Sequence, residues 1–421
     1  MVWSARNGEG AEERCQPQPW AVAGATFLAM LSTAAAVGSP SVLILPLSRE
    51  FGWSTTSISS ALSVRMALLG MVGLLAAPLL NTLGLKRFLL SALLLVGAGL
   101  LISLAMTQVW HLVLLWGVLV GIGAGMTTLV LGATVAARWF SQRRGLVVGV
   151  LAASASAGPF LASPALSALA EVAGWRSTVL TLTGLIALSG AAVFALVPDH
   201  PDNTMHGAAG RPNRAGLAAP VEELLGALRE AAGSGVFWVL LGTFAICGTS
   251  TSGLVQTHFV PFCADAGLSP LGSANVLALM GPLTILGSLA AGWLSDRFDS
   301  GWLLFWFFAL RGLSLACLAF TEASLLELSL FGIFYGLDWV ATVPPMVKIV
   351  IARFGVARAN LVLGWISAGH QFAAAAAAYG TGLSKDGLSS YLPALLAAGA
   401  LCLVAAAATP ILSVGDGGRR S

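Results

Sequence analysis

The stretch ARWFSQRRGLVVG at residues 137–149 returns as ARFGVARANLVLG at residues 352–364, an offset of 215 in the numbering. Both copies carry Ala-Arg-aromatic, a second arginine five positions after the first, and then Leu-Val-x-Gly. The same offset, without a gap, aligns Pro46 with Pro261, Gly52 with Gly267, Gly117 with Gly332 and Gly121 with Gly336. Chance similarity between apolar segments would not keep loop residues in one register across the chain. The sequence therefore indicates two repeated halves.

The composition places these halves in a membrane. Only 9% of the 421 residues are charged and 57% are apolar, too few charges to cover the surface of a soluble chain. A helix needs about 20 mostly apolar residues to cross the hydrocarbon core. Twelve such runs are present, near residues 20–46, 56–79, 87–107, 110–135, 145–168, 176–197, 236–259, 271–294, 302–320, 325–349, 360–381 and 390–413. Because lipid offers no partner for an open strand edge, we predict an all-α membrane protein of two six-helix bundles.

The positions of Lys and Arg predict the orientation. With the N-terminus in the cytoplasm, sixteen of the 21 fall in segments on the cytoplasmic side. Three (Arg49, Arg176 and Lys385) fall in outside loops, and two (Arg65 and Arg311) lie within spans. The positive-inside rule then places both termini in the cytoplasm. The first apolar run is too long for a signal peptide and is expected to be retained.

The predicted division has an N-terminal tail (1–19), a first bundle (20–198), a linker (199–235), a second bundle (236–413) and a C-terminal tail (414–421). Within the linker, residues 220–232 predict a short helix with Val221, Leu224, Leu225 and Leu228 on one face. This helix lies along the inner membrane surface or serves as a solvated linker. An offset of six helices makes the halves parallel repeats about an axis along the membrane normal, an arrangement that suggests alternating access.

The segment GWLSDR follows span eight. Over nearly its full length the chain resembles the major facilitator superfamily, whose GxxxDR signature is matched at Gly292, Asp296 and Arg297. A small residue lets two helices approach, and an acid and a base at the cytoplasmic end can make gate contacts that differ between two states. In the first-half copy the three positions are Ala77, Asn81 and Thr82. Pro344 and Pro345 must break backbone bonds in span ten, which predicts a kink suited to gating.

Within that superfamily, RWF at residues 138–140 followed by RRGL at 143–146 resembles the entry to span five of the monocarboxylate transporter family. The bacterial oxalate and formate antiporters are similar there. The resemblance implies a small carboxylate as substrate. The animal family has an Asp and an Arg four residues apart in span eight for proton coupling. Residues 277–288 carry no charge, so that pair is not carried over.

Arg65 is a charge in span two that needs a reason, because a charge among helices costs about 2.5–3.5 kcal/mol on insertion scales. Its mate in the repeat is the uncharged Met280, so the scaffold does not require it. The guanidinium could bind a substrate carboxylate with two parallel hydrogen bonds. The alternatives are a side chain that reaches outward to the interface or bonds helix carbonyls.

Asp338 in span ten replaces Gly123 of the first half. Arg311 in span nine lies at a similar depth, so one reading is a structural ion pair between neighbouring helices. The other is that Asp338 titrates or binds a substrate cation, with Tyr335 and Thr342 on the same helical face.

Three further polar side chains, Ser367, His370 and Gln371, share a face of span eleven by the i, i+3, i+4 rule. His370 is either a satisfied core histidine or a proton relay, since histidine is readily poised near neutral pH. Gln256 and His258 come near the outer end of span seven. They line the outer mouth or are merely interfacial.

These observations favour a secondary active transporter of a small organic anion, a monocarboxylate, working by alternating access with proton symport or exchange. The alternative is an exporter of apolar or cationic compounds that uses Asp338 in place of Arg65. A non-transporting receptor or scaffold is a third reading, which the intact Asp296 and Arg297 argue against.

Several classes of function are disfavoured. The chain has no HExxH, GxSxG or Walker loop, so an enzyme or an ATP-driven pump is not expected. The five cysteines are scattered without metal-ligand spacing, so no cofactor or metal is expected. A net charge of +3 does not suggest a nucleic-acid partner. The expected partners are a small-molecule substrate, a proton as coupling ion and the lipid bilayer. The chain is expected to work as a monomer in a bacterial inner membrane.

Overall fold

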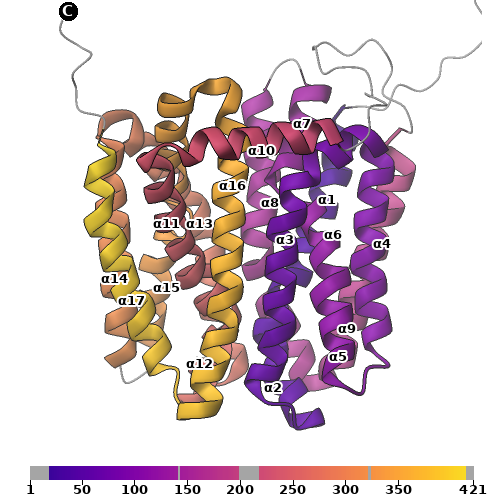
Figure 1. The fold of residues 1–421 in the computed structure, drawn as a ribbon. Coiled ribbons are helices and arrows are strands. Elements are labelled where there is room, and N and C mark those ends of the chain that lie inside the picture. The colour runs from indigo at the N-terminus through magenta and orange to yellow at the C-terminus, as the bar shows by residue number, and fades with distance from the viewer. Residues whose placement is uncertain (1–18, 141–142, 199–217, 321–323, 414–421) are drawn as a thin grey trace, which may run out of the picture.

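The structure is a computed structural model that describes residues 19–140, 143–198, 218–320 and 324–413, and all regular structure in these ranges is helical (Figure 1). The elements in chain order are α1 (Pro19–Gly38), α2 (Pro40–Phe51), α3 (Thr55–Leu83), α4 (Leu85–Ser103), α5 (Val109–Leu112), η1 (Val113–Leu119), α6 (Val120–Met126), α7 (Leu129–Trp139), α8 (Arg144–Leu161), α9 (Ser163–Leu196), α10 (Ala218–Ala232), α11 (Gly235–Gly248), η2 (Thr249–Val255), α12 (Gln256–Asp265), α13 (Pro270–Arg297), α14 (Ser300–Phe320), α15 (Leu325–Asp338), α16 (Val343–Leu388), α17 (Leu392–Ala408) and η3 (Thr409–Leu412). The predicted tails and most of the predicted linker lie outside the described residues.

Eleven segments of the described chain are long and apolar enough to cross a membrane. One of them, Arg144–Leu196, runs for 53 residues. That length suits two crossings, and the helix is interrupted inside it at Gly174, which has φ +81°. With this segment counted as two crossings, the eleven segments give the twelve predicted spans. The predicted all-α fold with two bundles of membrane-spanning helices is therefore confirmed.

The two bundles stand side by side, with α1 to α9 in one and α11 to α17 in the other (Figure 1). Helix α10 lies across one end of them, which we call the linker end. The opposite end, where α2 and α12 lie, we call the distal end.

The internal repeat is visible in the packing of equivalent helices. A Cβ placed on Gly121 of α6 would lie 3.0 Å from the Cα of Arg65 on α3. A Cβ on Gly336 of α15 would lie 2.9 Å from the Cα of Met280 on α13. The two glycines are mates in the repeat, and so are their two neighbours. Span four therefore packs on span two as span ten packs on span eight.

The turns ahead of α3 and α13 also repeat. Gly52 and Gly267 take φ values of +68° and +87°, a conformation that favours glycine. The side chains of Ser54 and Ser269 then cap the helices that follow. Local sequence thus starts both helices in the same way.

The predicted linker helix is α10, and its buried face differs from the predicted one. Leu224, Ala227 and Ala231 are buried, while Leu225 is 42% exposed. The indole N–H of Trp365 on α16 donates to the carbonyl oxygen of Leu224 at 3.0 Å. The helix is therefore docked on the second bundle, and two alanines are among its buried residues.

The two bundles meet along repeat-related helix pairs, α3 with α16 and α8 with α13. Ser63 Oγ donates to the carbonyl oxygen of Ala375 at 2.7 Å. Near the start of α9, Ser163 Oγ donates to the carbonyl oxygen of Ala274 at 3.2 Å. Helices α2 and α12 also touch at the distal end. The structure is therefore closed at the distal end.

Candidate functional site

Arg65 is a buried guanidinium without a partner in the part of the chain that the structure describes. Its side chain lies on α3, the residue is 3% exposed, and its Nε makes no hydrogen bond. The structure shows neither an ion pair nor a hydrogen bond to the rest of this guanidinium from the described residues. A buried charge is normally paired, because the desolvation cost is otherwise uncompensated.

This geometry allows a specific chemistry. A guanidinium presents five N–H donors in a planar fork and carries a positive charge, so an anion satisfies both its donors and its charge. A carboxylate fits best, because its two oxygens match two parallel N–H donors. The arrangement at Arg65 is therefore chemically suited to bind the carboxylate of a solute.

Arg311 differs, because all three of its nitrogen positions are engaged. Its Nε donates to Asp338 Oδ2 at 2.5 Å and its Nη2 to the carbonyl oxygen of Asp338 at 2.7 Å. Its Nη1 donates to Cys247 Sγ at 2.8 Å. The arginine thus ties α14 to α11 and to the C-terminal end of α15. Asp338 Oδ1 is buried and has no partner among the described residues.

The repeat shows what this pair replaces. The first-half mates of Arg311 and Asp338 are Val96 and Gly123. A Cβ on Gly123 would lie 2.7 Å from Val96 Cγ2, so the first half fills the same place with an apolar contact. The ion pair is therefore an addition that the helix packing itself does not need.

Tyr335 and Thr342 lie near the same cluster. The hydroxyl of Tyr335 donates to the carbonyl oxygen of Ser250 at 2.8 Å, and Thr342 Oγ1 lies 3.8 Å from Cys247 Sγ. Helix α15 ends at Asp338, so Thr342 does not continue its helical face as the spacing predicted.

Cys247 and Ser250 were missed by sequence reasoning. Their one-turn spacing on span seven was the available signal, and two small polar residues are too common in a span to single out.

The break in span ten lies where the two prolines predicted it. Helix α15 ends at Asp338 and α16 begins at Val343, with Pro344 and Pro345 in its first turn. Proline suits that turn because the N–H it lacks would have no helical partner.

The polar residues of span eleven do not form one site. The backbone of His370 packs directly against Gly248 of α11, and the His370 ring centroid lies 4.8 Å from that of Phe244. The Cβ of Gln371 lies instead 2.8 Å from a Cβ placed on Gly70 of α3. Ser367 is exposed. The helix turns these neighbours toward different partners.

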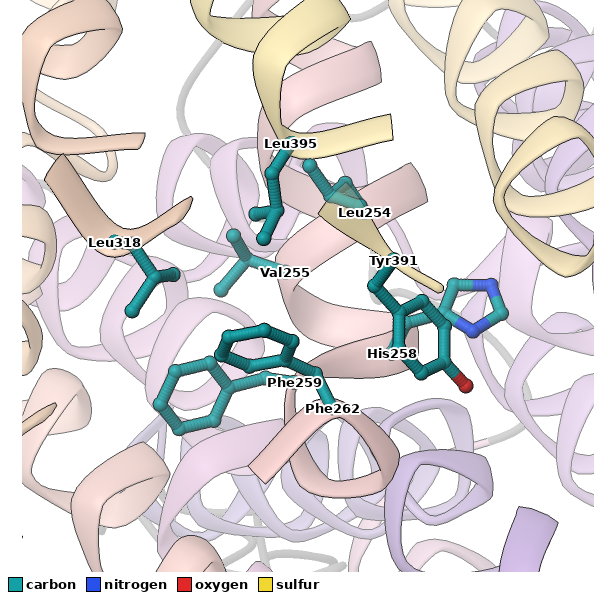
Figure 2. Close-up of a pocket in the computed structure, with 8 residues that line it drawn as sticks. All are labelled: Leu254, Val255, His258, Phe259, Phe262, Leu318, Tyr391 and Leu395. Atoms are coloured by element: carbon teal, nitrogen blue, oxygen red, sulfur yellow. The ribbon is translucent and has the colours of Figure 1, made fainter. Parts of the chain in front are cut away.

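His258 is not at an open mouth. It is 1% exposed, and its Nε2 lies 3.0 Å from the carbonyl oxygen of Ala378. It borders a crevice between η2 and α12, α14 and α17, whose other lining residues are Leu254, Val255, Phe259, Phe262, Leu318, Tyr391 and Leu395 (Figure 2). The free space there is about 10 Å³, about one water molecule, so the crevice holds no solute. Gln256 is partly buried at the start of α12.

A larger recess of about 220 Å³ lies between α1 and α8. Its lining is apolar and consists of Trp20, Ala23, Gly24, Phe27, Val147, Val150 and Leu151. Without a polar group this recess cannot orient a charged solute.

The signature residues lie at the linker end of α13. Asp296 and Arg297 are exposed, and the Arg297 guanidinium carbon lies 3.8 Å from the Trp293 ring centroid of its own helix. A Cβ on Gly292 would meet no atom within 4 Å, so the predicted close helix approach is absent in this conformation. In the first half, Arg138 Nη2 donates to Asn81 Oδ1 at 2.5 Å. The altered copy thus keeps a polar contact between α3 and α7.

The class of protein follows from this fold. A sequence profile of the Major Facilitator Superfamily matches residues 22–378, and the chain belongs to this superfamily. It is therefore a multi-pass membrane transporter by family.

Three sets of relatives add detail. An uncharacterized MFS-type transporter, YcxA, of Bacillus subtilis is 26% identical over 381 residues, covering 89% of this chain and 90% of that one. Monocarboxylate transporter 12 of Rattus norvegicus is 22% identical over 66% of this chain, and the match spans 60% of the rat protein. Human monocarboxylate transporter 11 is 31% identical over 52% of this chain and 44% of its own length.

Solved structures agree on the fold. A bacterial homologue of the human lysosomal transporter Spinster has TM-scores of 0.72 in its inward-facing occupied form and 0.74 in its inward-facing unoccupied form. Each is 15% identical and covers 94% of this chain and 97% of the other. At that identity the likeness shows the fold alone.

Proposed function

We propose that this chain is a secondary active transporter of a small organic anion, a monocarboxylate, and that Arg65 binds the substrate carboxylate. The observation that carries the proposal is the buried, unpaired guanidinium of Arg65. A ligand that brings a carboxylate supplies the missing partner. Its release restores the free guanidinium, so binding is reversible.

The alternative, export of cations by Asp338, is less well supported. Arg311 already neutralises that carboxylate through a contact of 2.5 Å. A cation would have to displace a buried arginine bonded to three groups. The side chains of Arg65, Arg311 and Asp338 together carry one excess positive charge, and this favours an anion over a cation as substrate.

The relatives support the same substrate class at a distance. Several matched proteins are named monocarboxylate transporters, with 22% to 31% identity. The matches span 60% and 44% of those two proteins, so their substrates support the proposal and do not decide it.

The remaining features of the proposal concern the cycle. Asp296, Arg297 and the break at Pro344 and Pro345 serve the opening and closing of the linker end. A proton is the coupling ion, with His370 as its carrier.

The chain works as a monomer, because one chain contains both repeated halves. Uptake driven by an imposed pH gradient, in vesicles that hold about one copy each, would test both statements, and indifference to the gradient would reject the proton.

A ligand screen tests the substrate class. Thermal unfolding of the purified protein would be measured against a panel of small carboxylates and a matched panel of amines. A ligand that binds only the folded state raises the melting temperature, by several degrees at about 100 times its dissociation constant. We expect shifts with carboxylates that disappear in Arg65→Gln. Shifts with amines alone would favour the cation exporter.

The orientation is also a proposal, with both termini and the linker in the cytoplasm of a bacterial inner membrane. Single cysteines at Gly207 and Ser384, in a background lacking the native cysteines, would be exposed to an impermeant thiol reagent in intact cells. We expect labelling at 384 and none at 207. The reverse pattern would overturn the orientation.

The gate proposal predicts that Asp296→Asn slows transport about tenfold and leaves folding intact. The residue is exposed and unpaired among the described residues in this distal-closed state, so its partner is expected in the other state. Exchange rates would be measured in reconstituted vesicles. Asp299→Asn is the matched control, because Asp299 Oδ1 caps α14 locally, accepting from the Gly301 N–H at 2.9 Å. Unchanged exchange in Asp296→Asn would reject the gate.

A further inference from the structure

Two carboxylates at the distal end join one half of the protein to the other. Asp386, near the end of α16, accepts hydrogen bonds from the backbone N–H groups of Thr55 at 3.2 Å and Thr56 at 2.7 Å. These are the first two residues of α3 in the other half. Glu171 of α9 accepts a hydrogen bond from the backbone N–H of Leu271, the second residue of α13, at 3.2 Å. Each carboxylate thus holds the first turn of a helix that belongs to the opposite bundle.

The two contacts are mates in the repeat. Residues 171 and 386 differ by 215, and so do residues 56 and 271. The first half therefore holds the second in the way that the second holds the first. A single incidental contact would not recur at the equivalent place with the roles exchanged.

The chemistry of these contacts is that of a helix N-terminus. The first N–H groups of a helix have no partner within the helix and carry partial positive charge, so a carboxylate stabilises them. The hydroxyl of Ser54 accepts a hydrogen bond from the Ser57 N–H, and that of Ser269 accepts one from the Gly272 N–H. The carboxylates of the opposite half accept hydrogen bonds from the N–H groups just before these.

The sequence explains why one contact is stronger. The position of Thr55 is taken in the second half by Pro270, which has no N–H. Asp386 therefore accepts two backbone hydrogen bonds and Glu171 accepts one. Close packing adds to the stronger side, because a Cβ on Gly382 would lie 3.0 Å from the Cα of Thr56.

We propose that Asp386 and Glu171 are two latches that hold the distal end shut, and that both must break each time this end opens during transport. Both side chains are exposed, so water replaces the lost hydrogen bonds when the latches part. The distal end can then open reversibly at a small cost in free energy. The proposal rests on the transporter class alone and is independent of Arg65 and of the substrate.

Two other acids at the same end provide matched controls. Glu50 is bound within its own half by Arg176 Nη1 and by the indole N–H of Trp175, each at 2.6 Å. Although burial acts to raise it, the pKa of Glu50 is lowered from 4.5 by the hydrogen bonds from Trp175 and Arg176 and by the charge of Arg176. Its repeat mate Asp265 is bound within its own half by Lys385 at 2.6 Å. These acids carry the same charge at the same end and do not bridge the halves.

The experiment measures how often the distal end opens. Spin labels at Arg49 and Ala266, both exposed at the distal end, would report the distance between the halves by double electron–electron resonance. The protein would be full length, free of its five native cysteines and reconstituted in lipid nanodiscs. We expect Asp386→Ala to raise the ratio of open to closed molecules on the order of fivefold and Glu171→Ala on the order of twofold. The double variant should show about the product of the two ratios.

The control variants show whether an increase in opening is specific to the two latches. Glu50→Ala and Asp265→Ala should leave the ratio unchanged, and equal opening by these variants would reject the latches. An unchanged ratio in the double latch variant would also reject them. Where Asp386→Ala does not fold, Asp386→Asn tests the charge at constant size.

A disulfide between Ser59→Cys and Gly382→Cys tests the need for opening. A Cβ on Gly382 would lie 3.1 Å from Ser59 Cβ, so the two helices need to part by only about 0.5 Å to reach the Cβ–Cβ distance of a disulfide. We expect the oxidised protein to stop transporting and to recover on reduction. Full transport by the oxidised protein would overturn the proposal.

Discussion

Replacing Arg65 with Gln is expected to reduce carboxylate uptake at least about 100-fold. Two charge-assisted hydrogen bonds contribute on the order of 1.5–3 kcal/mol each, and about 3 kcal/mol in total already corresponds to that factor. Arg65→Lys keeps the charge and loses the two-pronged geometry, so we expect an intermediate loss of about tenfold. Initial uptake rates in reconstituted vesicles, normalised to inserted protein, give the measurement.

The variant Arg65→Met is the sharpest control on stability. It copies the repeat mate Met280, which packs against Gly336 as Arg65 packs against Gly121. Because the guanidinium has no partner in the described structure, its loss should leave the ligand-free protein as stable as before or more stable. A structural role would instead lower the melting temperature. Normal uptake by Arg65→Gln, or a preference for cations, would refute the anion site.

The second large effect concerns the buried pair of Arg311 and Asp338. Breaking a buried pair by removing one partner leaves an uncompensated charge and costs about 3–5 kcal/mol. Arg311→Met and Asp338→Asn should therefore each lower the folded fraction sharply. The loss at Arg311 is expected to be the larger, because Cys247 Sγ also loses its donor.

The repeat offers a designed rescue. The double variant Arg311→Val with Asp338→Gly copies Val96 and Gly123, which already fill the equivalent place in the first half. We expect it to recover most of the stability lost by either single change, as read from thermal unfolding of the purified protein. Additive losses would mean that the two residues act independently. Transport by the rescued variant then tells whether the pair serves stability only or also the transport cycle.

Much of the fold could be predicted because its determinants are local. Lipid requires each crossing to satisfy its own backbone hydrogen bonds, so length and apolar composition suffice to locate the spans. The repeat could also be predicted from local sequence. Gly52 and Gly267 form equivalent turns, and Ser54 and Ser269 form equivalent helix caps. The predicted orientation of the linker helix was less accurate, because its contact with α16 depends on a partner far along the chain.

The candidate site was only partly predictable. Charge, depth and the difference from Met280 drew attention to Arg65, and the pairing of Arg311 with Asp338 was one of two readings. The three polar residues predicted on one face of span eleven have different neighbours, which the sequence did not indicate, because His370 packs on α11 while Gln371 packs on α3. Glu171 and Asp386 gave no signal as single residues. Their significance appears only when each is seen against a helix of the other half.

The sequence by itself determined the class of fold, the number of spans and the pairs of positions that are equivalent in the two halves. These depend on the period and composition of each segment and on one constant offset between the halves. The tertiary structure alone decided which charges meet: Arg311 reaches Asp338 and Cys247, Asp386 reaches across to α3, and Arg65 reaches no described partner. The physical reason is that apolar helices are nearly interchangeable as neighbours, so their rotation and order are set by close packing at small residues. That packing is a property of the whole bundle, and no single segment encodes it.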